Sequence, residues 1–200
     1  MRTIKEADAA TVRATVAVVA KISAEDLGRP TPCAEWDLGA LLAHMAGQHY
    51  GFAAAAAGQG GDLAVRRPVP LGADFVRGYA AAADAVVDAF GVEGVPDRPF
   101  ELPEISTEQA FPGRVAIGFH LVDYVVHGWD VATAIGVDWD LPDDVVAAAL
   151  PLARSVPGGA VREVPGAAFG PALPVAGGAT AMQEILSLLG RAPGPSHRIS

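Results

Sequence analysis

The feature that most constrains the fold is a helical period of apolar residues, which recurs along the chain between breaks rich in proline and glycine. In residues 4–22, apolar side chains return at three- and four-residue steps, the spacing of one face of a helix. The same period recurs in residues 37–57, 73–90 and 112–136. Because Ala-rich segments also favour helix intrinsically, the sequence predicts four long helices and a mainly all-α fold.

Residues typical of helix ends occur at the predicted boundaries of the second and fourth helices. Asp37 is a good N-cap for the second helix, since its carboxylate accepts a free backbone N–H of the first turn. Pro112 suits the first turn of the fourth helix, and Gly136 suits its end.

Shorter elements are expected outside these four helices. Residues 143–154 and 179–189 predict two more helices, and Pro151 is expected to kink the first of them or end it early. Residues 99–111 lack a helical period, which favours extended backbone and a short β hairpin.

Length and charge limit the organisation and the partners. The 200 residues fit one domain with a single core, so we expect residues 1–200 to form one domain with a flexible tail over residues 191–200. A net charge of -9 without a basic stripe argues against nucleic-acid binding. The most apolar stretches contain His, Asp and Trp, which argues against a membrane span and favours a cytoplasmic protein. The lone Cys33 excludes an intramolecular disulfide and a thiolate zinc cage.

Polar side chains inside two of the apolar stretches indicate a metal site. Asp123 and His127 are four residues apart, so their side chains rise from one helix face about one turn apart. Their surroundings are otherwise apolar, and buried polar groups need partners, of which a metal ion is one. His44 lies in an equally apolar stretch of the second helix and is the candidate third ligand. Imidazole and carboxylate suit zinc first, and nickel, iron or manganese as alternatives.

Other interpretations of these residues stay open at this point. An acidic residue four positions before a histidine is common by chance. If the histidines have a purely structural role, we expect the ring nitrogens of His44 and His127 to lie more than roughly 7 Å apart, which is too far for both to bind one ion. His120 is about two turns from His127, too far to chelate beside it, and is interpreted as pocket lining. His49 is rotated off the face of His44 and is more often core or surface.

Three ordered motifs resemble a known family. Residues 31–37 (Thr-Pro-Cys-Ala-Glu-Trp-Asp), followed by residues 41–44 (Leu-Leu-Ala-His), resemble the start of the second helix in DinB-like proteins of the mycothiol-dependent maleylpyruvate isomerase N-terminal type. Residues 126–132 resemble that group's His-Gly-Trp-Asp-x-Ala signature, and residues 189–193 resemble its closing Gly-Arg-x-Pro.

This resemblance implies a fold and a chemistry. It implies an up-down-down-up four-helix bundle with a long crossover, and a metal held by His44, Asp123 and His127. The isomerase has Glu where this chain has Asp123, whose side chain is one methylene shorter. It also implies mycothiol or another low-molecular-weight thiol as cosubstrate, which the metal activates by favouring the thiolate.

The sequence therefore leads to two hypotheses. The first is a metal- and thiol-dependent transferase or isomerase acting on a small electrophile, in which His120 or Tyr124 assists proton transfer. The alternative is a non-catalytic metal-binding or regulatory module on the same bundle, which a closed site with no cavity beside His127 would favour. The two hypotheses differ in whether the protein catalyses a reaction. A homodimer is the candidate assembly in both.

Overall fold

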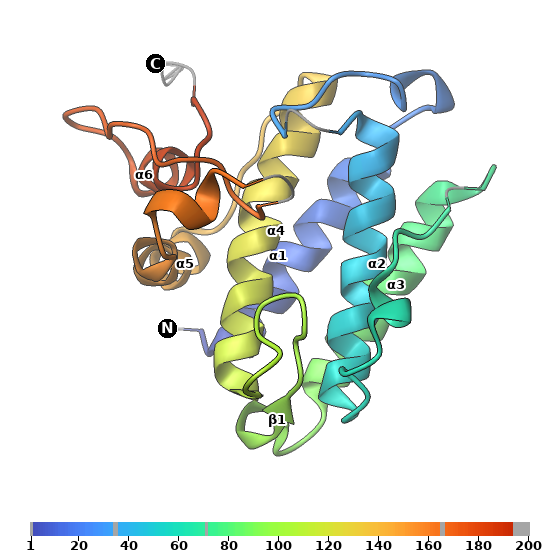
Figure 1. Ribbon diagram of the computed structural model, residues 1–200. Coiled ribbons are helices and arrows are strands. Elements are labelled where there is room, and N and C mark those ends of the chain that lie inside the picture. The colour runs from blue at the N-terminus through green and yellow to red at the C-terminus, as the bar shows by residue number, and fades with distance from the viewer. Residues whose placement is uncertain (1, 34–35, 71, 165–166, 194–200) are drawn as a thin grey trace.

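Four long helices form a bundle in the computed structural model, which describes residues 2–33, 36–70, 72–164 and 167–193 (Figure 1). They are α1 (Ile4–Val19), α2 (Leu38–Ala56), α3 (Phe75–Gly91) and α4 (Gly113–Ile135). Followed along the chain, α1 rises, α2 and α3 both descend, and α4 rises again. The predicted all-α bundle is confirmed, and the crossover between the parallel helices α2 and α3 is the long segment of residues 57–74.

The helix ends follow the capping residues. The Asp37 carboxylate accepts a hydrogen bond from the Ala40 backbone N–H at 2.8 Å, as predicted. Gly136 ends α4 with φ +70, a left-handed conformation that glycine adopts at no steric cost. The first helix is shorter than predicted, because after Val19 the N–H groups of Lys21 and Ile22 bond three residues back and form a tighter turn.

A two-stranded antiparallel sheet precedes α4. Strand β1 (Pro99–Phe100) pairs with β2 (Phe111–Pro112), and Phe100 lies opposite Phe111. The expected hairpin is therefore confirmed. The remaining short elements are the 3₁₀ turns Ala24–Asp26, Leu63–Arg66, Val95–Asp97 and Gly159–Arg162.

Two further helices cover one side of α4. They are α5 (Asp143–Ser155) and α6 (Ala181–Leu188), and Pro151 lies inside α5 without ending it. One apolar cluster joins them to α4, and its members include Leu121, Val125, Val126, Val145, Ala149, Ile185 and Leu189. The C-terminal helices are thus fixed against the helix that carries Asp123 and His127.

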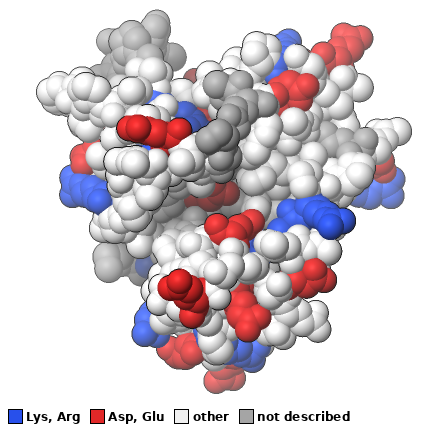
Figure 2. All heavy atoms as spheres, in the orientation of Figure 1, with Lys and Arg blue, Asp and Glu red and all other residues white. Residues whose placement is uncertain are grey.

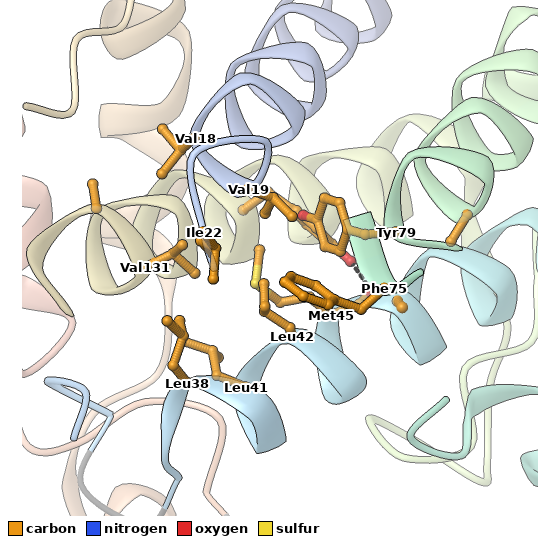
Figure 3. Close-up of a cluster of buried hydrophobic side chains, with 14 residues drawn as sticks. Val18, Val19, Ile22, Leu38, Leu41, Leu42, Met45, Phe75, Tyr79 and Val131 are labelled. Carbon is orange, nitrogen blue, oxygen red and sulfur yellow. Dashed lines mark hydrogen bonds between the residues drawn. The ribbon is translucent and has the colours of Figure 1, made fainter. Parts of the chain in front are cut away.

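A second apolar cluster joins α1, α2, α3 and α4 at the end of the bundle where α2 begins (Figure 3). It is built from Val18, Val19, Ile22, Leu38, Leu41, Leu42, Met45, Phe75, Tyr79 and Val131, among others. Within this cluster the Tyr124 hydroxyl donates a hydrogen bond to the Met45 carbonyl. Because Met45 follows His44 and Tyr124 follows Asp123, this bond fixes the relative position of the two helices beside the predicted site.

Charges are spread over the surface. On the face in Figure 2, acidic and basic side chains are intermixed rather than gathered into one basic stripe. No helix in the described part of the chain has both the length and the apolar character needed to cross a membrane.

Candidate metal centre

The structure brings His44, Asp123 and His127 together between α2 and α4. One donor atom from each residue lies within 4.8 Å of the donor atoms of the other two. His44 and Asp123 are half-buried, whereas the His127 side chain is only 2% exposed. The group is therefore recessed, with His44 and Asp123 more accessible than His127.

Helix geometry explains how the residues meet. On α4 the four-residue spacing places His127 Nε2 3.4 Å from Asp123 Oδ1. His44 comes from the facing helix, and its ring centre lies 5.7 Å from that of His127 in an edge-on arrangement of 79°. These donor atoms lie closer together than the roughly 7 Å or more that the purely structural alternative expects of the ring nitrogens, so the geometry permits shared ligation.

Trp36 packs against both imidazoles. Its ring centre lies 4.3 Å from that of His44 and 6.1 Å from that of His127. Trp36 immediately precedes the N-cap residue Asp37, so the start of α2 also forms one wall of the site. An aromatic wall restricts the rotamers available to His44 and keeps its ring near the other two donors.

The electrostatics of the two histidines differ. Burial lowers the pKa of His44 to about 4, although the charge of Asp123 opposes this shift. Burial alone also lowers the pKa of His127, but the carboxylates of Asp123 and Asp130 outweigh it and raise that pKa overall. At neutral pH, His44 is thus a neutral nitrogen donor, and His127 lies in a negative environment that attracts a cation.

Asp130 holds the other side of the His127 ring. Its Oδ2 lies 3.0 Å from His127 Nδ1, and the guanidinium of Arg191 donates to both carboxylate oxygens at 2.8 and 2.9 Å. Burial raises the pKa of Asp130, but the hydrogen bonds and charges of His127 and Arg191 lower it overall. The sequence analysis did not connect Asp130 or Arg191 with His127.

Arg191 corrects the prediction of a tail. The residue was expected to begin a flexible segment, yet it is only 5% exposed and fixed to α4. Residues 194–200 of the predicted tail lie outside the described residues.

A second group of donors shares His127. Cys33, His127 and Asp130 also present donor atoms within 4.8 Å of one another. Both oxygens of Asp130 already accept hydrogen bonds from Arg191, so an ion there would lie beside a guanidinium that already balances the carboxylate charge. His44, Asp123 and His127 therefore form the better site for an ion.

His120 and Tyr124 do not join this group. His120 is fully buried, with Nδ1 2.7 Å from Asp8 Oδ1 and Nε2 3.2 Å from His49 Nδ1. The Tyr124 ring stacks on both His49 and His120, and its hydroxyl donates a hydrogen bond to the Met45 carbonyl. Both side chains thus belong to a separate polar cluster in the bundle core, in which His49 is also buried.

Comparisons with known proteins give matches over most of the chain. A family model described as the mycothiol maleylpyruvate isomerase N-terminal domain matches residues 9–132, more than half of the chain and nearly the whole four-helix bundle. Uncharacterized proteins from two strains of Mycobacterium tuberculosis (CDC 1551 / Oshkosh and ATCC 25618 / H37Rv) are each 32% identical over 179 residues, which covers 89% of this chain and 92% of the relative. No solved structure gives a significant match.

Proposed function

The chain belongs to the mycothiol maleylpyruvate isomerase N-terminal domain family, and on this basis we propose that it is a metal- and thiol-dependent transferase or isomerase. In this proposal His44, Asp123 and His127 hold one divalent ion, and a low-molecular-weight thiol of the mycothiol type reacts with a small electrophile beside it. The observation that carries the proposal is the convergence of three donor atoms from two helices within 4.8 Å.

The donor set fits a catalytic ion. Two imidazoles and one carboxylate are a typical set for zinc with an open position, and nickel, iron and manganese are alternatives. In a tetrahedral site, two donors bound at roughly 2.0–2.2 Å to one ion lie about 3.3–3.6 Å apart. His127 Nε2 and Asp123 Oδ1 already lie 3.4 Å apart, and His44, whose donor atom lies within 4.8 Å of both, would reach the ion by a side-chain rotation.

The bound ion, His44 and Asp123 have distinct tasks in the proposed reaction. A bound divalent ion supplies acidity, because it lowers the pKa of a coordinated thiol and so favours the thiolate at neutral pH. His44 is neutral and ready to donate its lone pair, since burial disfavours its protonated form. The Asp123 side chain is 19% exposed against 2% for His127, so it is the more accessible of the two ligands on α4.

The role of His120 and Tyr124 in proton transfer stays a prediction. Both side chains are fully buried and are hydrogen-bonded within the cluster that also contains Asp8 and His49. This role requires a path along which a proton moves between that buried cluster and the three proposed metal ligands.

Thiol binding is tested with cobalt-substituted protein. Adding mycothiol to the full chain loaded with Co²⁺ is expected to produce a thiolate-to-cobalt charge-transfer band, whereas S-methylated mycothiol, which has no ionisable thiol, is expected to produce none. Consumption of the thiol with a chromogenic haloarene electrophile then measures turnover. A cobalt protein whose spectrum and thiol content stay unchanged would overturn the thiol-dependent function.

The alternative is a metal-binding module without turnover. Two cavities among the described residues are lined by other segments, one by α1 and residues 136–140 and one by residues 156–162 and 167–169, and neither includes the three donors. Metal binding without a charge-transfer band would support this second function and contradict the first.

A further inference from the structure

We infer that Asp130 and Arg191 are positioning residues for His127, so that the segment following α6 contributes to the metal centre. This inference rests on the proposed metal site. It concerns the side of the imidazole that faces away from Asp123, where the ring meets a buried ion pair.

The two ring nitrogens of His127 have different surroundings. Nε2 lies 3.4 Å from Asp123 Oδ1, at the donor group. Nδ1 lies 3.0 Å from Asp130 Oδ2, an acceptor that is fully buried. A carboxylate can only accept a hydrogen bond, so the proton of the neutral ring resides on Nδ1 and the lone pair on Nε2 faces the donor group. A histidine that binds a metal commonly has such a carboxylate on its second nitrogen, which fixes the tautomer and the ring plane.

Arg191 keeps Asp130 in this role. Its Nε and Nη2 atoms donate to the two carboxylate oxygens at 2.9 and 2.8 Å, a two-pronged geometry that fixes the plane of the carboxylate. Its Nη1 donates to the Leu189 carbonyl at 3.3 Å, so all three guanidinium nitrogens are engaged. Because these nitrogens are engaged, Arg191 is not available to bind an anionic substrate. Its positive charge instead balances that of the Asp130 carboxylate, which is not exposed to water.

The backbone after α6 aims Arg191 at Asp130. Gly190 has φ +77, and the Arg191 N–H donates to the Leu186 carbonyl at 2.8 Å, which closes the end of the helix. A Cβ on Gly190 would lie 2.8–2.9 Å from the Gly170 backbone, so the position also needs a glycine for close approach. Arg191 lies outside the matched residues 9–132, so the matched bundle supplies the ligands and a later segment orients one of them.

The test compares two altered positions with two matched controls in the full chain. Asp130→Asn removes the charge that faces Nδ1, and Arg191→Lys keeps a cation but loses the two-pronged contact. Asp8→Asn alters another buried Asp–His pair, at His120, away from the donor group. Arg162→Lys alters another buried arginine of the C-terminal region, which donates only to backbone carbonyls.

Zinc affinity is measured by competition with a chromogenic chelator. Asp130→Asn is expected to bind Zn²⁺ about 10–100-fold more weakly than wild type, the usual loss when the partner of a ligating histidine is changed. Arg191→Lys is expected to fall between Asp130→Asn and wild type, and both controls to stay within about twofold of wild type even where they unfold at lower temperature.

A second readout separates orientation from stability. Nitrogen-15 chemical shifts of His127 in the metal-free protein at high pH are expected to show the tautomer protonated at Nδ1 in wild type and a mixture of tautomers in Asp130→Asn. Equal zinc affinity and equal tautomers in wild type and Asp130→Asn would overturn the inference, as would an equal loss of affinity in the controls. A wild type that binds no zinc at all would instead overturn the proposed function.

Discussion

The glycine of the His-Gly-Trp-Asp segment has a steric explanation that can be tested by adding one methyl group. An ideal Cβ on Gly128 would lie 2.3 Å from Cζ2 and 2.4 Å from Cη2 of Trp139, whereas ordinary contacts begin at about 3.4 Å. Trp139 has little room to retreat, because its indole N–H donates to the Val125 carbonyl at 3.0 Å and its ring packs against the cluster of α1 and α2. Gly128→Ala must therefore displace the indole by about 1 Å.

The expected cost follows from three contributions. Overpacking costs about 1–3 kcal/mol, and losing the indole hydrogen bond adds about 0.5–1.5 kcal/mol. Alanine in place of glycine inside a helix returns about 1 kcal/mol. We expect Gly128→Ala to lower the free energy of unfolding by about 0.5–3.5 kcal/mol, measured by urea denaturation.

The chain offers a matched control on another helix. Gly78 lies within α3, is exposed, and has no atom within 4 Å of an added Cβ. Gly78→Ala is expected to raise the free energy of unfolding by about 0.5–1 kcal/mol. In a Trp139→Leu background, Gly128→Ala should cost much less. The reasoning is refuted if Gly128→Ala is as stable as wild type, or if its cost is the same with and without Trp139.

Three further predictions concern other parts of the structure. Burial, and to a smaller extent the charge of His120, lowers the pKa of His49 well below its usual value. Below about pH 6.5 the unfolded chain therefore takes up a proton at this histidine that the folded chain does not. Wild type should lose stability as the pH falls from 6.5 to 5, and His49→Gln should reduce that slope by about 1.4 kcal/mol per pH unit; equal slopes in denaturation at each pH would contradict this. Asp123→Asn replaces a charged ligand by a neutral amide and should weaken zinc binding at least about tenfold in chelator competition. It should also lower the pKa of His127 in an NMR titration, because Asp123 raises that pKa, and an unchanged value would show that the two side chains are not coupled. Asp37→Ala removes the N-cap of α2 and should cost about 0.5–2 kcal/mol in thermal or urea unfolding, whereas no loss would show that the cap at Ala40 contributes nothing.

Local patterns account for most of what the sequence could predict. Apolar periodicity located α2 and α4 to within one or two residues, because both helices are bounded by strong signals at Asp37 and Gly136. The i,i+4 spacing placed Asp123 beside His127, since it depends on helix geometry alone. The apolar setting of His44 made it the candidate third ligand, and the family resemblance supported that choice, because no local rule indicates which helix faces α4.

Long-range contacts account for what the sequence could not predict. The Asp130–His127 contact was within reach of sequence reasoning, since the residues are three apart on one helix. The Arg191–Asp130 pair joins residues 61 positions apart, and the Asp8–His120 pair joins residues 112 positions apart. No periodicity connects such residues, so the separate polar cluster around His120 and the fixed position of Arg191 emerged only from the packed bundle.

The most direct test of the central claim is the metal content of the purified full chain. Wild type, His127→Ala and the control His49→Gln are expressed side by side, freed of loosely bound ions and analysed by inductively coupled plasma mass spectrometry. His127 lies in the donor group, whereas His49 is buried in the other cluster. We expect about one divalent ion per chain in wild type and His49→Gln, and almost none in His127→Ala. A wild type without metal, or a His127→Ala variant that retains as much as wild type, would contradict the account.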